Sequence, residues 1–329
     1  MKISFLNLQE VMKLNRMFKL IKNEVKKTFS QKSTPIMLAL LVVVVLIGGF
    51  ILKANTPIAT NDWKIQLTQT NQTLQTQLTL PQTGPGKTKE EMQEEITTNT
   101  YRMDHDFPPI EGRTLWGFVI PISSLISLVS LLTIIVGAGS IAGEFSDGTI
   151  KLLLSRPFKR WKILLSKYIS VLVFALVGLL TLFVASFLIG GMFYGFSGVT
   201  QPFLAYTDGA VHEVNMIWHI FTTYGYGCVS LLMMVTFAFT ISTVSRNNSL
   251  AVGISIFSMF TGSMLVNLLK NYSWVKYILF ANTDLTQYIS GTPVVSGMTM
   301  SFSLTVLAAY FVIFNAISWL VFSRRDVVA

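Results

Sequence analysis

Six long apolar segments divide this sequence, and each is long enough to cross a lipid bilayer. An α-helix rises about 1.5 Å per residue, so a hydrocarbon core of about 30 Å needs roughly 20 apolar residues. Lipid offers the backbone no hydrogen-bond partner, so such segments must be helical. The predicted spans are residues 36–52, 115–141, 168–194, 217–244, 249–269 and 302–322.

Composition indicates the same class. Hydrophobic residues make up 51% of the chain and charged residues only 12%, whereas soluble domains carry about 25% charged residues. The basic residues behind the net charge of +9 cluster beside the apolar segments, and no nucleic-acid-binding motif accompanies them. A lone cysteine, Cys228, excludes an intramolecular disulfide. We predict an all-α membrane protein with a six-span domain over residues 35–329 and no nucleic-acid partner.

The distribution of basic residues sets the predicted orientation. A cytosolic amino terminus places 17 of the 25 lysines and arginines on the cytosolic side. The short loops agree, because residues 143–167 are strongly basic and residues 195–216 carry no lysine or arginine. We therefore expect a multi-pass plasma-membrane protein with both termini in the cytosol.

Residues 1–34 are predicted to form an amphipathic helix on the cytosolic membrane surface. Stepping 100° per residue gathers apolar side chains on one arc and lysines on the other, although Leu20 interrupts the pattern. The apolar arc consists of Val11, Leu14, Met17, Phe18, Ile21 and Val25. The alternative is a cleaved signal peptide. It is disfavoured because no small-residue cleavage motif follows the apolar run.

Residues 53–113 form a predicted extracellular insertion rich in Gln and Thr, with a helix at about 87–101 and no hydrophobic core of its own. Residues 81–88 match a phosphate-binding loop except that Pro81 replaces the first glycine. The polar sequence before them is unlike the strand that such a loop follows, so we reject ATP binding there. Asp104, His105 and Asp106 are adjacent without a partner cluster, and we interpret them as solvated residues rather than metal ligands.

The predicted spans contain no Asp, Glu, Lys or Arg, and His219 lies at the edge of the fourth. Ion-coupled carriers ordinarily keep an ionisable group at membrane depth. We interpret His219 as an interfacial side chain, so the driving energy is expected to come from elsewhere.

Residues 143–167, between the second and third spans, have the layout of a docking element. An acidic helix end is followed by a glycine break, an apolar half-turn and a basic stretch punctuated by proline. The candidate coupling residues are Glu144, Asp147, Gly148, Thr149, Leu152, Leu153, Arg156, Pro157 and Arg160.

This pattern resembles the coupling-helix region of type-2 ABC exporter permeases. The family pattern falls on Glu144, Gly148, Thr149, Leu152, Leu153, Pro157, Arg160, Leu165 and Lys167. Lys151 and Ser166 depart from it, standing where the family often has an acid and usually has glycine. Residues 101–116 are similar to permeases of Gram-positive bacteria linked to peptide-antibiotic resistance or export.

The resemblance implies a bacterial permease subunit that is not itself an enzyme. A separate ABC ATPase subunit would bind ATP and Mg, and a second permease copy or paralogue would complete a dimer in membrane lipid. This chain would hold no cofactor or metal. The residues 1–34 would correspond to the family's elbow helix. The implied substrate is amphipathic: a peptide antibiotic, a drug or a lipid-like molecule.

Some readings stay open. Residues 270–300 are either a surface loop resting on headgroups or a pair of short re-entrant helices capping the outer mouth of a pathway. A non-transporting scaffold or sensor subunit bound to an ATPase is the alternative function. An ion-coupled carrier is disfavoured by the uncharged spans.

Overall fold

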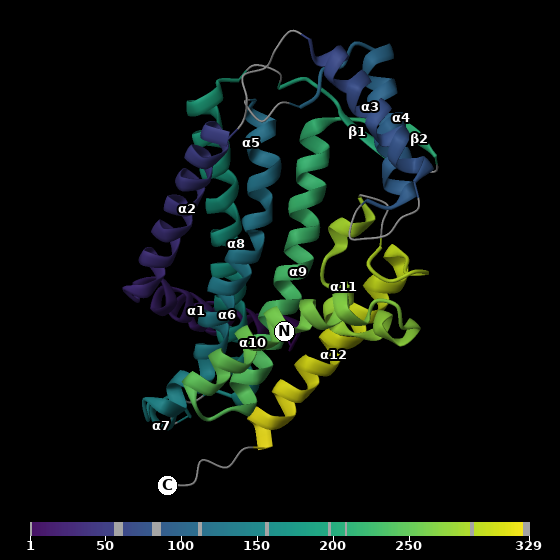
Figure 1. The fold of residues 1–329 in the computed structure, drawn as a ribbon. Coiled ribbons are helices and arrows are strands. Elements are labelled where there is room, and N and C mark those ends of the chain that lie inside the picture. The colour runs from purple at the N-terminus through teal and green to yellow at the C-terminus, as the bar shows by residue number, and fades with distance from the viewer. Residues whose placement is uncertain are drawn as a thin grey trace.

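The computed structural model describes residues 2–55, 62–80, 87–110, 114–154, 158–196, 199–207, 209–289 and 293–324. Long helices form a bundle, and a small polar subdomain covers one end of it (Figure 1). By length and composition, six helical segments can cross a membrane, and each predicted span lies within one of them. They are α2 (Ser33–Asn55), α5 to α6 (Leu115–Ile122 and Ile126–Ser146), α8 (Arg160–Tyr194), α9 (Met216–Val244), α10 (Asn248–Leu269) and α12 (Met300–Arg324).

The core of the bundle lies where α6, α8 and α9 meet. The largest apolar cluster joins α5, α8 and α9 with α2, and includes the fully buried Phe118 and Leu182 together with Leu231. In contrast, α2, α10 and α12 carry large exposed apolar side chains on their outer faces. In an aqueous protein such a surface would be costly, whereas lipid tails cover it without loss. These features identify an all-α, multi-pass membrane protein.

The second span is broken between α5 and α6. Pro121 lies inside α5 and has no backbone N–H, and the 3₁₀ turn η1 (Ser123–Leu125) separates α5 from α6. The Ser123 hydroxyl donates to the Ile120 carbonyl at 2.6 Å, and that of Ser124 donates to the Pro121 carbonyl at 2.7 Å. The serines satisfy carbonyls that the interrupted helix leaves with poorer partners.

The helix α1 (Lys2–Ser30) lies across the lower part of the bundle and packs against α8 (Figure 1). Its protein-facing side chains include Leu20 and Glu24, both buried, whereas Phe18 is 68% exposed. The predicted apolar arc therefore faces away from the protein around Phe18. The residue that interrupted the arc, Leu20, is the one that packs inward. Val11 and Leu14 lie where no side chains are described.

The insertion contains a helical hairpin, α3 (Trp63–Thr79) and α4 (Lys89–Asp104), and α4 confirms the predicted helix. The expectation of no hydrophobic core was wrong, because Leu74, Met92 and Ile96 are buried between the two helices. Two strands, β1 (Phe203–Thr207) and β2 (Ala210–Val214), pair in antiparallel fashion and contact α4. This strand pair is the exception to the helical architecture in the described part of the chain.

Short helices connect α10 to α12: η2 (Ser273–Tyr277), α11 (Leu279–Asn282) and η3 (Leu285–Tyr288). The buried Asn282 fixes them, because its Oδ1 accepts from the Ser303 hydroxyl at 2.7 Å. Their packing against α9 and α12 supports short helices over a loose surface loop. Whether they re-enter a membrane stays a prediction.

Candidate functional site

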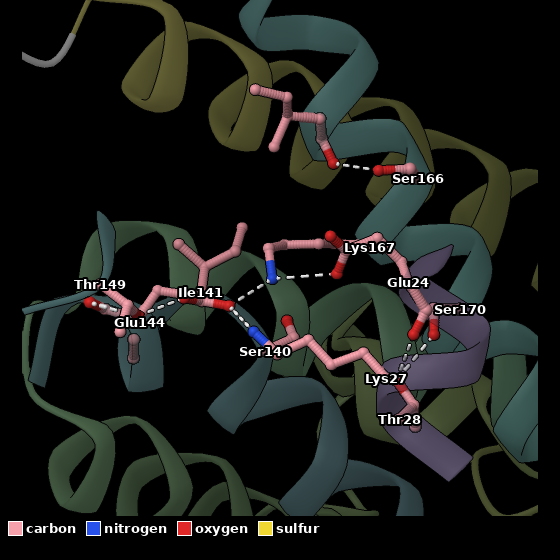
Figure 2. A network of polar contacts seen from close by, with 12 residues as sticks. Glu24, Lys27, Thr28, Ser140, Ile141, Glu144, Thr149, Ser166, Lys167 and Ser170 are labelled. Carbon is pink, nitrogen blue, oxygen red and sulfur yellow. Dashed lines mark hydrogen bonds and ion pairs between the residues drawn. The ribbon is translucent and has the colours of Figure 1, made fainter. Parts of the chain in front are cut away.

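Four charged side chains from three helices meet at the end of the bundle away from α3 and α4 (Figures 1 and 2). Glu24 and Lys27 come from α1, Glu144 from α6 and Lys167 from α8. The Lys167 Nζ atom lies 2.8 Å from Glu144 Oε1 and 3.2 Å from Glu24 Oε2. Lys27 Nζ approaches the same Glu144 oxygen at 2.5 Å. We call these four residues the charge cluster.

Burial makes the charge cluster energetically demanding. Lys167 is only 4% exposed, and both glutamates are buried as well. An unpaired charge in such surroundings costs several kcal/mol of desolvation, so the ion pairs must be made within the fold. Two carboxylates and two ammonium groups give a cluster with no net charge. The cluster therefore serves first to lock α1, α6 and α8 together.

The docking element is attached to this cluster. The Thr149 hydroxyl donates to Glu144 Oε2, and Thr149 precedes the short helix α7 (Ile150–Leu154). Gly148 ends α6 with a φ of +69°, a left-handed conformation that glycine adopts without strain. Thus α7 begins in a turn that is tied directly to the charge cluster.

One face of helix α7 packs against the bundle, and the other face is exposed on the surface of the molecule. Ile150 is buried in an apolar cluster with Ile141 and Ile163, whereas Leu152 is 72% exposed. Asp147 is also exposed at the end of α6. The side chain of Leu153, and the whole of Arg156 and Pro157, lie outside the described residues.

The remaining candidates point inward. The Glu144 carboxylate is occupied by Lys27, Lys167 and Thr149, so the expected pairing of Glu144 with a partner protein is replaced by pairing within the chain. Arg160, at the start of α8, donates to the Ser323 carbonyl of α12 at 3.1 Å. These two residues position the helices around α7 rather than forming its exposed surface.

A second feature is a cavity of about 810 Å³ nearer the insertion. The residues that line it come from η1, α6, α9 and α10, and also from α4, β1, α11 and η3. His219, the predicted interfacial residue, lines this cavity with its ring stacked on Phe203 at 3.6 Å between centroids. Glu94 of α4 also lines it. Partial burial, and to a smaller extent the charge of Glu91, raises the pKa of the Glu94 carboxyl.

Residues of the phosphate-loop match at 81–88 and of the Asp104–Asp106 cluster form local contacts within the insertion. Thr88 caps α4 by accepting from the Glu91 amide, while the Glu91 carboxylate accepts from the Thr88 amide at 2.7 Å. The helix α3, rather than a strand, precedes that segment, whose residues 81–86 are outside the described part. Asp106 pairs with Lys64 at 2.7 Å, and His105 stacks on Tyr101.

Sequence reasoning missed the charge cluster, although it left a signal. Glu24 is the single acid between Val11 and Ser33, Glu144 lies just after the second predicted span, and Lys167 lies immediately before the third. The apolar helices extend past those spans, to Ser146 in α6 and back to Arg160 in α8. The statement that the spans carry no charge therefore holds for the predicted ranges but not for the helices.

The fold and the charge cluster define a multi-pass helical membrane protein whose amino-terminal helix is locked to the bundle by ion pairs. Residues 92–328 match the family described as "Protein of unknown function (DUF2705)", and the chain belongs to that family. It is 44% identical over 317 residues to "Uncharacterized protein YhcI" of Bacillus subtilis (strain 168), covering 94% of this chain and 99% of that protein. It is also 33% identical to "Uncharacterized membrane protein YdbK" of the same organism, over 64% of this chain and 82% of the relative.

Proposed function

We propose that this protein is the membrane subunit of an ATP-driven exporter of the type-2 ABC class, working with a separate ATPase subunit. One observation carries the proposal. A short helix, α7, presents an exposed leucine at the end of the molecule away from the polar insertion, while Ile150 anchors it in the bundle. An apolar projection of this kind suits a groove on a partner protein.

The contacts behind α7 support transmission of movement. A displacement of α7 would be transmitted to α6 through the contact between Thr149 and Glu144. It would be transmitted to α8 and α1 through the ion pairs of Lys167. Packed helices joined by buried ion pairs move as a unit rather than deforming locally. A closing ATPase dimer would therefore tilt α6 and α8 together and alter the membrane pathway between two permease copies.

An ion-coupled carrier is a second candidate, because Lys167, Glu24 and Glu144 are buried ionisable groups at the ends of apolar helices. Their mutual pairing favours a structural role over proton exchange, since each charge is already matched. A scaffold or sensor subunit would use the same ATPase contact without moving a substrate.

The experiment is to co-express the tagged chain with ABC ATPases of the organism that encodes it and to reconstitute the resulting pair in proteoliposomes. We expect a stable complex with ATP hydrolysis faster than that of the ATPase alone. We also expect ATP-dependent movement of an amphipathic substrate. Movement driven by an imposed ion gradient without ATP would instead support the carrier. Stimulated hydrolysis without transport of any tested amphiphile would support the sensor.

A further inference from the structure

The geometry points to the 810 Å³ cavity as a binding site for an amphipathic organic cation, with Glu94 of the extracellular insertion supplying a carboxylate at its rim. This inference rests on the proposed function only in naming the bound cation as the exporter's cargo. The volume lies in the range of about 300–1,000 Å³ that small-molecule sites occupy.

The polar lining consists mainly of hydrogen-bond acceptors. Ser127 donates to the Ser124 carbonyl at 2.8 Å, Thr223 to that of His219 at 3.0 Å, and Ser263 to that of Met259 at 3.2 Å. A hydroxyl has one proton, so each of these oxygens retains only acceptor capacity toward the cavity. The lining hydroxyls that donate to carbonyls in this way also include Ser123, Ser124, Ser130 and Thr283. Oxygen lone pairs attract a cation and offer nothing to an anion.

The charged lining has one sign. Two carboxylates, those of Glu94 and Asp284, face the cavity, and no lysine or arginine is found among the described residues that line it. Asp284 caps η3 by accepting a hydrogen bond from the Thr286 amide at 3.0 Å, so one of its carboxylate oxygens already has a partner. Glu94 has no hydrogen bond or ion pair recorded among the described residues. The raised pKa of Glu94 is consistent with a carboxylate that lacks a nearby cation.

The apolar lining fits the rest of such a ligand. Phe260 and Phe280 add aromatic faces, and Met234 and Met259 add flexible, polarizable side chains. Aromatic faces attract organic cations within about 6 Å, and methionine adapts to ligands of varied shape. Acceptors, carboxylates and aromatic rings together select a positive charge attached to an apolar body.

The arrangement also gives the polar insertion a role. Glu94 lies on α4, whereas the hydroxyls lie on η1, on the membrane helices α6, α9 and α10, and at the end of α11. The hairpin α3–α4 is held beside the membrane helices by β2, since the Tyr101 hydroxyl donates to Glu213 at 3.1 Å. The insertion thus contributes a carboxylate to a site whose other lining comes from the helices of the bundle, the short helices before α12 and strand β1.

The test uses the full chain in nanodiscs of neutral phosphatidylcholine, without any ATPase. Labelled tetraphenylphosphonium and tetraphenylborate are the probes, because they have nearly the same shape and opposite charge. Equilibrium dialysis should give saturable binding of tetraphenylphosphonium above that of empty nanodiscs, and none of tetraphenylborate. Saturable binding of both ions, or of neither, would overturn the proposal.

Two variants locate the site. Glu94→Gln should weaken the cation's affinity about fivefold, the size expected for losing one partly solvated charge, whereas Glu90→Gln, exposed on the same helix, should leave it unchanged. Ser127→Phe should fill the cavity and remove saturable binding while the protein elutes normally from gel filtration. Should Ser127→Phe aggregate, the Glu94→Gln and Glu90→Gln comparison decides alone. Equal affinities for these two variants would mean that the cation binds elsewhere.

The outcomes separate this inference from the proposed function. Cation binding in nanodiscs, combined with no complex between the chain and any ABC ATPase of its organism, would keep the site and refute the ABC assignment. An ATPase-coupled exporter that binds neither probe would keep the proposed function and refute the site.

Discussion

Lys167 forms an ion pair with both buried carboxylates of the charge cluster. Lys27 assists at Glu144 but is 53% exposed, so its ion pair is screened by water and contributes less. Among the described residues, Lys167 is the one ion-pair partner of Glu24. Removing the Lys167 ammonium group should therefore lower stability mainly because it leaves the buried Glu24 carboxylate without an ion-pair partner.

We predict that Lys167→Met destabilises the protein by about 3–5 kcal/mol, the cost typical of breaking a buried ion pair from one side. Lys162→Met, on the same helix and less buried, should change stability little. The measurement is the free energy of unfolding in detergent for each purified variant. Adding Glu24→Gln and Glu144→Gln to Lys167→Met should recover much of the loss, because the charge that then remains unpaired, on Lys27, is 53% exposed to solvent. Equal stability of Lys167→Met and Lys162→Met would contradict the structural role of the cluster.

At the scale of elements, the contact between α10 and α11 is especially close. A β-carbon built on Gly262 would lie 2.3 Å from the Phe280 ring, whereas one on Gly253 of the same helix meets nothing within 4 Å. Phe280 also packs against Phe237 of α9 with ring centroids 6.0 Å apart. The ring is therefore fixed from two sides.

Gly262→Ala should accordingly lower the stability by about 1–3 kcal/mol through overpacking. Gly253→Ala should be neutral or slightly stabilising, because alanine is the better helix former. Thermal melting of the two variants in the same detergent measures the difference. A melting temperature of Gly262→Ala at or above that of Gly253→Ala would show that α11 does not pack as described.

Most of the long helices, but not the strand pair, could be predicted from the sequence. The six apolar helices were predictable because lipid fixes both their length and their hydrogen bonding. The helix α4 was predictable from its acidic start, with Thr88 and Glu91 forming a capping box. The strand pair β1–β2 was missed, although Asp208-Gly209 between apolar and aromatic residues is a hairpin signal.

The sites were harder to predict than the spans. The exposed face of α7 followed from a local pattern, whereas the charge cluster joins positions up to 143 residues apart, and no local pattern pairs Glu24 with Lys167. The cavity likewise depends on the break at η1 and on how α4 packs against β1 and β2. Contacts between residues this far apart in the sequence are set by how whole helices pack, and a local sequence pattern does not contain that information.

At the scale of the molecule, α7 and the hairpin α3–α4 lie at opposite ends of the bundle (Figure 1). The predicted orientation puts α7 in the cytosol and the hairpin outside. Cysteines introduced at Gln93 and at Lys151, both exposed, in a Cys228→Ser background should therefore behave differently. In intact cells an impermeant thiol reagent should label the cysteine at 93 and spare that at 151. Labelling at 151 alone would invert the orientation and exclude a cytosolic ATPase contact at α7.

The central claim is that α7 transmits ATPase movement to the bundle, and the most direct measurement is ATP hydrolysis by the reconstituted complex. Leu152→Ala combined with Leu153→Ala should leave the protein inserted and dimeric. It should abolish stimulation of the ATPase, because a central apolar contact is worth about 2 kcal/mol or more. Leu250→Ala is the matched control, since Leu250 is 59% exposed near the start of α10, where the Asn248 amide donates to Ser146 at the end of α6. The account predicts full stimulation by Leu250→Ala and none by the double variant, and normal stimulation by the double variant would contradict it.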